Sequence, residues 1–349
     1  MPAYVLLVGN PTAQTGRAAA RIDTALQAMQ ARGWAAQLLP TEPEGRTVGQ
    51  VARAVDEGPW DVVVYLGGDG TFAEVAKGLL AARRKVPMGM LPSGTANNQG
   101  RSFGVSSDPD ALNENLDVIE AGHVTHLDVG QVEKVDEQGK ALATELFFDS
   151  VGWGFHADVL EQRNKDREVV ERIPLLREIY RDQAVYAGAA LNRYLVSWVE
   201  PTVFDVVVQT HGAVHRYTRL TDLIINATPV YAGDWVLDRR AEPDDGRFEL
   251  VPVKGRRELL TKVVLDFRRS PLWREHMDAI GTFHSDGYSA DAFDIQLTRP
   301  GKYDIPCQLD GEEWEAGDTF RVRVLPRLLP LLTPPEFIPP WREVDPLDG

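Results

Sequence analysis

Residues 61–71 read DVVVYLGGDGT, and this stretch decides the fold class of the chain. The apolar run at 61–66 has the length and composition of a buried β-strand, and two glycines close it. Residues 72–82 then show the apolar spacing of a helix. A strand that enters a helix through a glycine-rich turn is typical of a parallel sheet with helices on both faces.

The same alternation extends outward from this stretch. Strands are predicted at 4–8, 34–39 and 87–91, and helices at 16–32 and 48–56. Strands separated by single helices indicate a parallel, Rossmann-like sheet. Ligands of such sheets bind beyond the carboxyl ends of the strands, so we expect the functional loops there.

Beyond about residue 130 the chain changes character. Short β-rich segments separated by Asp-Gly and Pro-Gly turns replace the strand–helix alternation. We therefore predict a nucleotide-binding α/β domain over 1–128 and a mostly antiparallel β-sandwich over 129–325, with a helical insertion at 162–198. Residues 326–349 are rich in Pro and Leu, and we expect this tail to pack back across the domains.

Charge and composition exclude several classes of protein. A formal net charge of −15 argues against nucleic acid as a partner. The segment 254–274 carries seven basic and two acidic residues; it is typical of a solvated helix face, with docking to an anionic membrane as the alternative. No run approaches ~18 apolar residues, so no membrane span is expected. Cys307 is the single cysteine, and we expect it to be a small buried residue. A single cysteine and a start without signal-peptide features favour a cytoplasmic location.

The loop after the central strand indicates a phosphate site. Gly67, Gly68 and Gly70 let the backbone approach an anion closely, and the N–H groups at the start of the next helix face it. Thr71 adds a hydroxyl donor. Asp69 would repel phosphate, so it suggests a metal ion or proton transfer. The alternative is a tight turn with an Asp-capped helix.

Two further loops follow strands in the same half of the chain. Residues 91–98 read LPSGTANN and could meet the same phosphates from the opposite side. Asn10-Pro11-Thr12 with Gly16 forms the other loop. Each alone is an ordinary turn. Together, at successive strand ends, the three loops predict one nucleotide cleft.

These motifs resemble the diacylglycerol kinase catalytic-domain family, which includes bacterial lipid kinases and the sphingosine kinases. The Gly-Gly-Asp-Gly-Thr segment alone is shared with NAD kinases and phosphofructokinase relatives. The resemblance is more specific because it covers nearly the whole chain as an ordered set: Asn10-Pro11 with Gly16, Gly67–Thr71 with Glu74, Pro92–Asn97, His126–Gly130, Phe147–Ala157, Asp244–Gly246 and Leu309–Glu312.

The resemblance implies a two-domain kinase that binds ATP and Mg²⁺ and phosphorylates a lipid hydroxyl at a membrane surface. It implies that Glu312 is the general base, with Asp69 and Asp128 holding catalytic Mg²⁺ or orienting the base. The implied nucleotide-binding residues are Asn10, Thr41, Gly67, Gly68, Asp69, Gly70, Thr71 and Thr95.

The resemblance also implies a structural metal and a substrate site. Asp245 would hold a second Mg²⁺ with backbone carbonyls of Glu242 and Arg247. Asn98 and Arg101 would meet the substrate, although many family members have Asp where this chain has Asn98. An amide carries no charge, so this departure puts metal binding and substrate class in question.

Local sequence alone gives these carboxylates other roles. Asp310-Gly311 is a common hairpin turn, which would make Glu312 a solvated strand residue. Asp245-Gly246 is likewise a turn, and Asp128 caps a strand end. Two other functions stay open: an NAD kinase-like small-molecule kinase, and a nucleotide or lipid sensor that has lost catalysis. An edge strand also offers a route to a homodimer.

Overall fold

The computed structural model describes residues 2–13, 17–158, 203–233, 235–255, 258, 287–299, 304–337 and 339. The predicted helical insertion at 162–198 and nearly all of the basic segment lie outside these residues. Contacts divide the chain into two compact units. Unit 1 comprises Met1–Val129, Thr228–Gly246 and Leu325–Gly349, and unit 2 comprises Gly130–Ala227 and Arg247–Val324.

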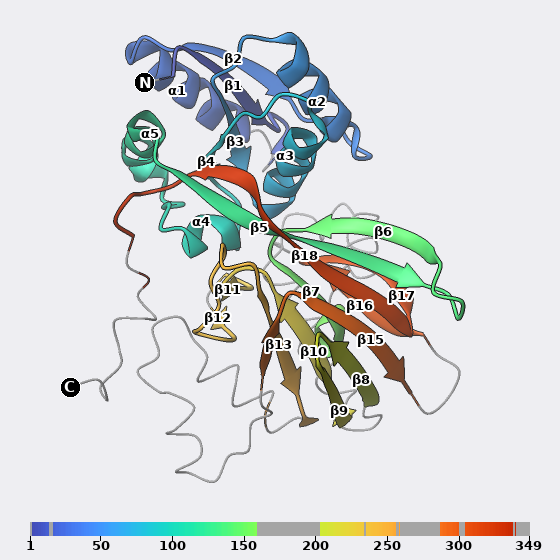
Figure 1. Cartoon of the computed structure of the whole chain (residues 1–349). Helices are drawn as coiled ribbons and strands as arrows, with labels where there is room; N and C mark the ends of the chain where they lie inside the picture. Colours follow the sequence, from blue (N-terminus) through green and yellow to red (C-terminus); the bar gives the residue numbers. More distant parts are fainter. Residues whose placement is uncertain are drawn as a thin grey trace, which may run out of the picture. The chain divides into compact units, whose positions relative to one another are not determined.

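Unit 1 contains a parallel sheet in the order β2-β1-β3-β4 (Figure 1). Its strands are β1 (Tyr4–Gly9), β2 (Ala35–Pro40), β3 (Val62–Gly67) and β4 (Met88–Pro92). Its helices are α1 (Arg17–Ala31), α2 (Arg46–Glu57), α3 (Asp69–Ala81), α4 (Asn98–Ser102) and α5 (Leu112–Ala121), the last preceded by the 3₁₀ turn Pro109–Ala111. The predicted Rossmann-like α/β fold is confirmed.

The helices of unit 1 cover both faces of its sheet. Side chains of α1 and α5, such as Ile22 and Leu116, share a buried cluster with alternate residues of β1 and β3. On the other side α2 packs against α3, where the absence of a side chain at Gly78 lets Val51 approach. Within the described part of the chain, no helix is long and apolar enough to cross a bilayer.

Unit 1 also gathers segments that are distant in sequence. Residues 228–246 include the short hairpin β11 (Val230–Tyr231) and β12 (Trp235–Val236). The backbone N–H of Val230 donates to Ser102 Oγ at 3.2 Å, and Phe337 packs on Val230 and Val236. Residues 228–246 were predicted to belong to the second domain, whereas their contacts group them with unit 1. Local sequence patterns do not indicate such long-range contacts.

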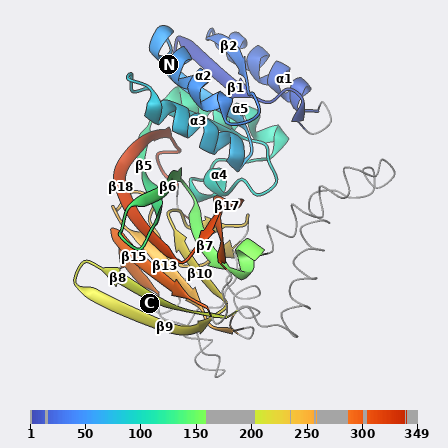
Figure 2. The same cartoon turned by 90° about the vertical axis from the view of Figure 1, so that its right-hand side faces the viewer.

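Unit 2 consists of antiparallel strands in two groups. One sheet has the order β14-β13-β10-β7-β16-β17. Its strands are β7 (Ser150–Gly154), β10 (Asp222–Asn226), β13 (Phe248–Val253), β14 (Tyr288–Ala290), β16 (Ile305–Leu309) and β17 (Glu312–Gly317). The other group has β5 (Val124–Val135), β6 (Ala141–Phe147), β8 (Phe204–Thr210), β9 (Ala213–Leu220), β15 (Ala292–Thr298) and β18 (Thr319–Leu332). Figure 2 shows these strands from a second direction.

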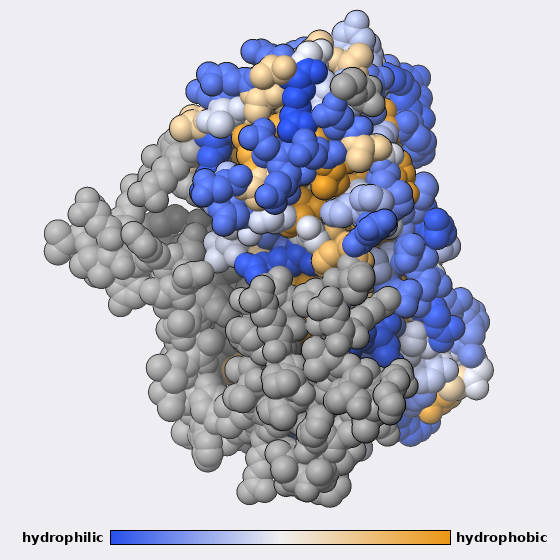
Figure 3. Space-filling model, turned by 90° about the vertical axis from the view of Figure 1, so that its left-hand side faces the viewer, coloured by the Kyte–Doolittle hydropathy of each residue, from blue (hydrophilic) through white to orange (hydrophobic). Residues whose placement is uncertain are grey.

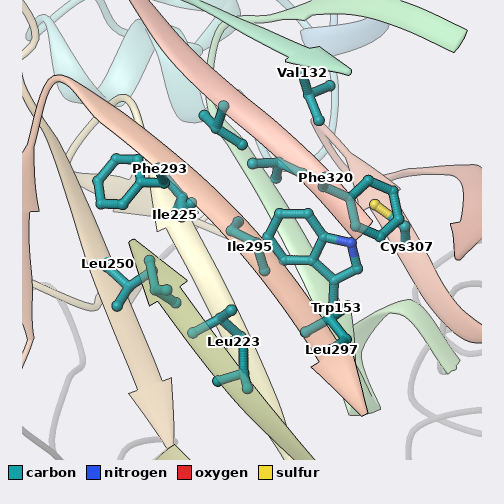
Figure 4. Close-up of a cluster of buried hydrophobic side chains, with 14 of the residues drawn as sticks. Val132, Trp153, Leu223, Ile225, Leu250, Phe293, Ile295, Leu297, Cys307 and Phe320 are labelled. Atoms are coloured by element: carbon teal, nitrogen blue, oxygen red, sulfur yellow. The ribbon is translucent and has the colours of Figure 1, made fainter. Parts of the chain in front are cut away.

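A hydrophobic core joins the two groups of strands (Figure 4). Alternate residues point inward, as the two-residue period of a strand requires. Trp153 of β7 meets Phe320 of β18 with ring centroids 5.1 Å apart. Cys307 lies in the same core and is buried, as predicted. The predicted antiparallel sandwich is confirmed.

The strands β5 and β18 each contribute residues to both units. Past residue 325, β18 continues to Leu332, and its Leu331 pairs in parallel with Met88 of β4 inside unit 1. The first part of the predicted tail is therefore a strand. Its alternate residues Leu329 and Leu331 are fully buried. Nearly all of the tail beyond Phe337 lies outside the described residues.

Candidate functional site

The carboxyl ends of β1 to β4 carry the loops that the sequence singled out. Thr41 follows β2, and its N–H donates to the carbonyl of Gly9 at the end of β1 (3.0 Å). Asn10 accepts hydrogen bonds at Oδ1 from the N–H and hydroxyl of Thr12, at 3.0 and 2.8 Å. The Thr41–Gly9 bond holds the first two loops beside each other, and the Asn10–Thr12 bonds order the first of them. This is the edge at which ligands of open parallel sheets bind.

The glycine-rich loop after β3 leads directly into α3. The helix begins at Asp69, with extended Gly68 as its N-cap, so Gly70 and Thr71 lie in the first turn. Sequence spacing placed the helix start at Phe72, because glycines disfavour helix. The first N–H groups of a helix have no partner within it and carry a partial positive charge. They suit an anion such as phosphate.

A second loop closes tightly on the first. The N–H of Ser93 donates to the carbonyl of Gly67 at 2.7 Å. A Cβ added at Gly94 would lie 2.5 Å from the Cα of Gly68, so only glycine allows this approach. Asn97 braces Gly94 through two 2.8 Å bonds, accepting from its N–H and donating to its carbonyl. The structure thus brings together the two predicted phosphate loops.

Asp69 is hydrogen-bonded to the end of the second loop. Its carboxylate accepts a hydrogen bond of 3.4 Å from the N–H of Gln99, in the first turn of α4. Burial raises the pKa of Asp69, while the backbone N–H groups of Gln99, Asn97 and Asn98 lower it. Asp69 therefore positions the 93–99 loop. The assignment of Asp69 to metal or base orientation stays a prediction.

The predicted substrate residues lie on the same loop. Asn98 is 7% exposed, and its Oδ1 accepts a 2.6 Å bond from the N–H of Gly233 in the β11–β12 hairpin. Arg101 donates from Nε to the carbonyl of Ala96 at 2.8 Å. Thr95 is exposed at the tip of the loop. Asn98 thus ties α4 to the hairpin, a role that a carboxylate would also fill.

A pocket of about 280 Å³ opens beside this loop, between α1 and the 107–115 segment. Its floor includes Leu66, Leu91 and Pro92, and Arg21 donates to the carbonyl of Ser93 at its rim (3.3 Å). Figure 3, seen from the side on which α5 lies in Figure 1, shows hydrophobic side chains recessed among hydrophilic ones in unit 1. Sequence reasoning did not single out this pocket.

Asp128 is fully buried in the part of β5 that belongs to unit 1. Its carboxylate accepts from the N–H groups of Gly246, at 2.5 Å, and Arg327, at 2.6 Å. Burial raises the pKa of Asp128; the two N–H groups lower it, and the negative charges of Asp245 and Asp244 raise it. Asp128 therefore holds the 243–246 turn, whose Asp244 and Asp245 add negative charge to its surroundings.

This concentration of acids gives the predicted structural metal a test. Among the described residues, no three His, Cys, Asp or Glu side chains are grouped to hold a metal ion. The prediction, however, needs only Asp245 and the backbone carbonyls of Glu242 and Arg247. Those are hard oxygen donors, and a cation there would offset the repulsion that raises the pKa of Asp128. The donor chemistry fits Mg²⁺.

If Asp245 binds Mg²⁺, the melting temperature of the wild type will rise when Mg²⁺ replaces EDTA, because a ligand that binds only the folded state stabilises it. The Asp245→Asn variant is expected to lose most of this rise. Glu137→Gln removes an exposed acid elsewhere and serves as the control. An unchanged Mg²⁺ response in Asp245→Asn would contradict this metal assignment.

Glu312 begins β17 in unit 2 and is exposed. The preceding Asp310 and Gly311 have φ of 49° and 80°, the left-handed geometry of a two-residue hairpin turn. The carboxylate of Asp310 accepts from the N–H groups of residues 148, 149 and 150 at 2.7 to 3.1 Å. The turn that carries Glu312 is therefore fixed against β7, whichever role Glu312 has.

Just after β7, His156 forms an ion pair with Asp222 that the sequence did not indicate. His156 hydrogen-bonds through Nδ1 to the fully buried carboxylate of Asp222. Burial alone would lower the pKa of His156, but the facing carboxylate outweighs it and raises that pKa. The two residues are 66 positions apart, so no local pattern could have joined them.

Comparison with known proteins identifies the N-terminal part of the chain. Residues 4–132 match the family model for the diacylglycerol kinase catalytic domain. The predicted family resemblance is confirmed. The diacylglycerol kinases of Staphylococcus aureus strain MRSA252 and Staphylococcus saprophyticus are 31% and 29% identical to this chain over 126 residues. Those residues make up 36% of this chain and 39% and 40% of the two kinases, so the alignment spans well under half of each relative.

Solved structures extend the likeness in fold. A diacylglycerol kinase from Bacillus anthracis superposes with a TM-score of 0.66, covering 96% of this chain and 98% of its own, at 17% identity. Yeast NADH kinase in complex with NADH superposes with a TM-score of 0.51, covering 95% and 83% at 10% identity. At these identities the structures show a shared fold. The diacylglycerol kinase family match itself ends at residue 132, before the segments that carry Asp245 and Glu312.

Proposed function

We propose that this protein is an ATP-dependent lipid kinase that phosphorylates a hydroxyl group of a diacylglycerol-type or related lipid. The observation that carries the proposal is the close approach of Gly68 and Gly94 in front of α3. Two glycine loops held against each other beside the first N–H groups of a helix suit the phosphates of a nucleotide. The family match covers these loops.

Each unit is described by the residues it contributes. In unit 1, Asn10, Thr41, Gly67–Thr71 and Thr95 bind the nucleotide. In unit 2, Glu312 takes the proton from the lipid hydroxyl as it attacks. Phosphoryl transfer requires mainly positioning and charge stabilisation, and a base at hydrogen-bond distance from the hydroxyl contributes further.

Bound Mg²⁺ would neutralise the charge that develops on the phosphates during transfer. It usually keeps several waters and takes one or two carboxylates together with substrate oxygens, so a dedicated cluster of acids is not required. Asp69 supports this fit because its carboxylate lies half-buried at the loop itself. Asp69 and Asp128 also hold the loops of unit 1 in place through backbone bonds.

We further propose that the protein acts on its lipid at the cytoplasmic surface of a membrane. A panel of micellar lipids with Mg²⁺ and labelled ATP tests the reaction. The panel contains diacylglycerol, monoacylglycerol, phosphatidylglycerol, sphingosine and ceramide. Label on at least one lipid supports the proposal, whereas NAD phosphorylation without lipid labelling would favour an NAD kinase-like enzyme.

Asn98 motivates the second candidate function, a sensor that binds ligands without turnover. Asn98→Asp keeps the oxygen that accepts from Gly233, so we expect the variant to fold normally. A functional kinase should change its transfer rate by less than about tenfold, because the variant keeps the Gly233 bond that anchors this loop and leaves Glu312 unchanged. Rates in the lipid panel measure this change. A wild type without turnover that gains activity in Asn98→Asp would instead support the sensor.

A further inference from the structure

The pocket between α1 and the 107–115 segment has no role in the proposed kinase. Its walls come from α1, from the ends of β3 and β4, and from the segment that leads into α5, all of which belong to unit 1. Among the described residues of these walls, none belongs to the set expected to bind the nucleotide. The volume of about 280 Å³ lies just below the usual range for drug-sized ligands, so a smaller molecule suits it.

The floor of this pocket is apolar. Leu66 and Leu91 are the next-to-last residues of β3 and β4, and their side chains are 5% and 4% exposed. Pro92 is buried beside them, and Leu112 adds an apolar group from the opposite wall. Figure 3 shows hydrophobic side chains recessed on this side of unit 1. The apolar part of a ligand gains free energy by covering such a floor, because both surfaces leave water.

One buried polar side chain lines the same pocket. Asn115 is 6% exposed, and its Nδ2 donates to the carbonyl of Ser106 at 2.8 Å. Its Oδ1 makes no hydrogen bond with any residue that the structure describes. Most buried side-chain oxygens in proteins have a partner. An O–H group on a bound molecule is a donor that would complete Asn115.

A cationic side chain stands at the rim. Arg21 donates from Nη1 to the carbonyl of Ser93 at 3.3 Å. A guanidinium has five N–H donors and matches a carboxylate in shape, so it can hold a backbone carbonyl and an anion together. Asp108 lies across the rim, where it is exposed and accepts from the N–H of Asp110 at 3.0 Å. Solvent and salt screen an exposed charge of this kind.

We infer that this pocket binds a small hydroxylated carboxylate, at a site separate from the nucleotide loops. The hydroxyl group donates to Oδ1 of Asn115, and the apolar middle of the molecule covers Leu66 and Leu91. The carboxylate faces Arg21 at the rim. Each part of the ligand thus meets a side chain of matching chemistry. The inference goes beyond the proposed kinase reaction and does not depend on it.

The test titrates the purified chain with three probes and follows binding by NMR. 4-Hydroxybenzoate carries both polar groups on one apolar ring, benzoate lacks the hydroxyl, and phenol lacks the carboxylate. We expect 4-hydroxybenzoate to bind about tenfold more tightly than either of the others, because each of them lacks one hydrogen-bonding group. Equal affinity for all three probes, or no binding of 4-hydroxybenzoate, would overturn the inference.

Ala20→Leu locates the bound probe. Ala20 is exposed on α1 and lines the pocket, so a larger side chain there takes up its space. Leucine is a good helix former, and the melting temperature should therefore stay close to that of the wild type. Affinity for 4-hydroxybenzoate should fall at least about tenfold, the loss of one or two contacts.

Ala31→Leu is the matched control. It makes the same change at an exposed position of α1 outside the described walls of the pocket, so affinity for 4-hydroxybenzoate should be retained. Equal affinity in Ala20→Leu and Ala31→Leu would place the probe elsewhere on the protein, and the inference would then be wrong.

A titration with saturating ATP and Mg²⁺ separates this site from the proposed one. Retained binding of 4-hydroxybenzoate is expected. Competitive displacement by ATP would make the pocket part of the nucleotide site and would overturn the inference. If the wild type neither binds ATP nor labels a lipid, the kinase proposal alone fails, and the comparison of Ala20→Leu with Ala31→Leu still decides the inference.

Discussion

Glu312→Gln is expected to lower phosphate transfer to the preferred lipid by about 10²–10⁴-fold, the usual contribution of a general base. The amide keeps the size and hydrogen-bonding capacity of the side chain but cannot accept the proton of the attacking hydroxyl. Because Glu312 is exposed and belongs to unit 2, the fold and the nucleotide loops of unit 1 should be untouched. Single-turnover transfer with labelled ATP measures the loss.

Glu313→Gln is the matched control, because it changes the adjacent exposed glutamate of β17 in the same way. It should retain activity within a few-fold of the wild type. Melting curves and ATP binding should be the same for both variants. Equal activity of Glu312→Gln and wild type would show that Glu312 is only the solvated strand residue that its local sequence suggests.

A second large effect is expected from Gly94→Ala. The new methyl group would lie 2.5 Å from the Cα of Gly68, so the two loops must separate. Such overpacking usually costs about 1–3 kcal/mol of stability, and the proposed phosphate site opens with it. We expect both a lower melting temperature and at least tenfold weaker ATP binding, measured by calorimetry.

Gly70→Ala separates these two consequences. A Cβ at Gly70 meets no atom within 4 Å, and alanine favours helix over glycine, so stability should be equal or higher. Yet Cβ atoms in a helix tilt toward its N-terminus, the side where phosphate is proposed to bind. ATP binding should therefore weaken without loss of stability. Unchanged ATP affinity in both variants would exclude this loop pair as the phosphate site.

Local sequence determined the architecture of the N-terminal part to within a few residues. Apolar runs such as 61–66, the helical spacing of 48–56 and the glycines at 67–70 act through backbone preferences and periodic burial, which are local properties. For the same reason the antiparallel sandwich was predictable from short β-rich segments and turns. Even the error at the start of α3 has a local cause, since Gly68 and Gly70 are weak helix formers.

Only the tertiary structure decided which groups the polar side chains meet. Asp128 bonds with Gly246 and Arg327, and Asn98 bonds with Gly233, across 118, 199 and 135 residues of sequence. Hydrogen-bond partners depend on how distant segments pack, and local sequence does not encode that packing. The sequence thus determined which elements form and where the loops predicted to bind phosphate lie, while long-range packing decided what their carboxylates and amides contact.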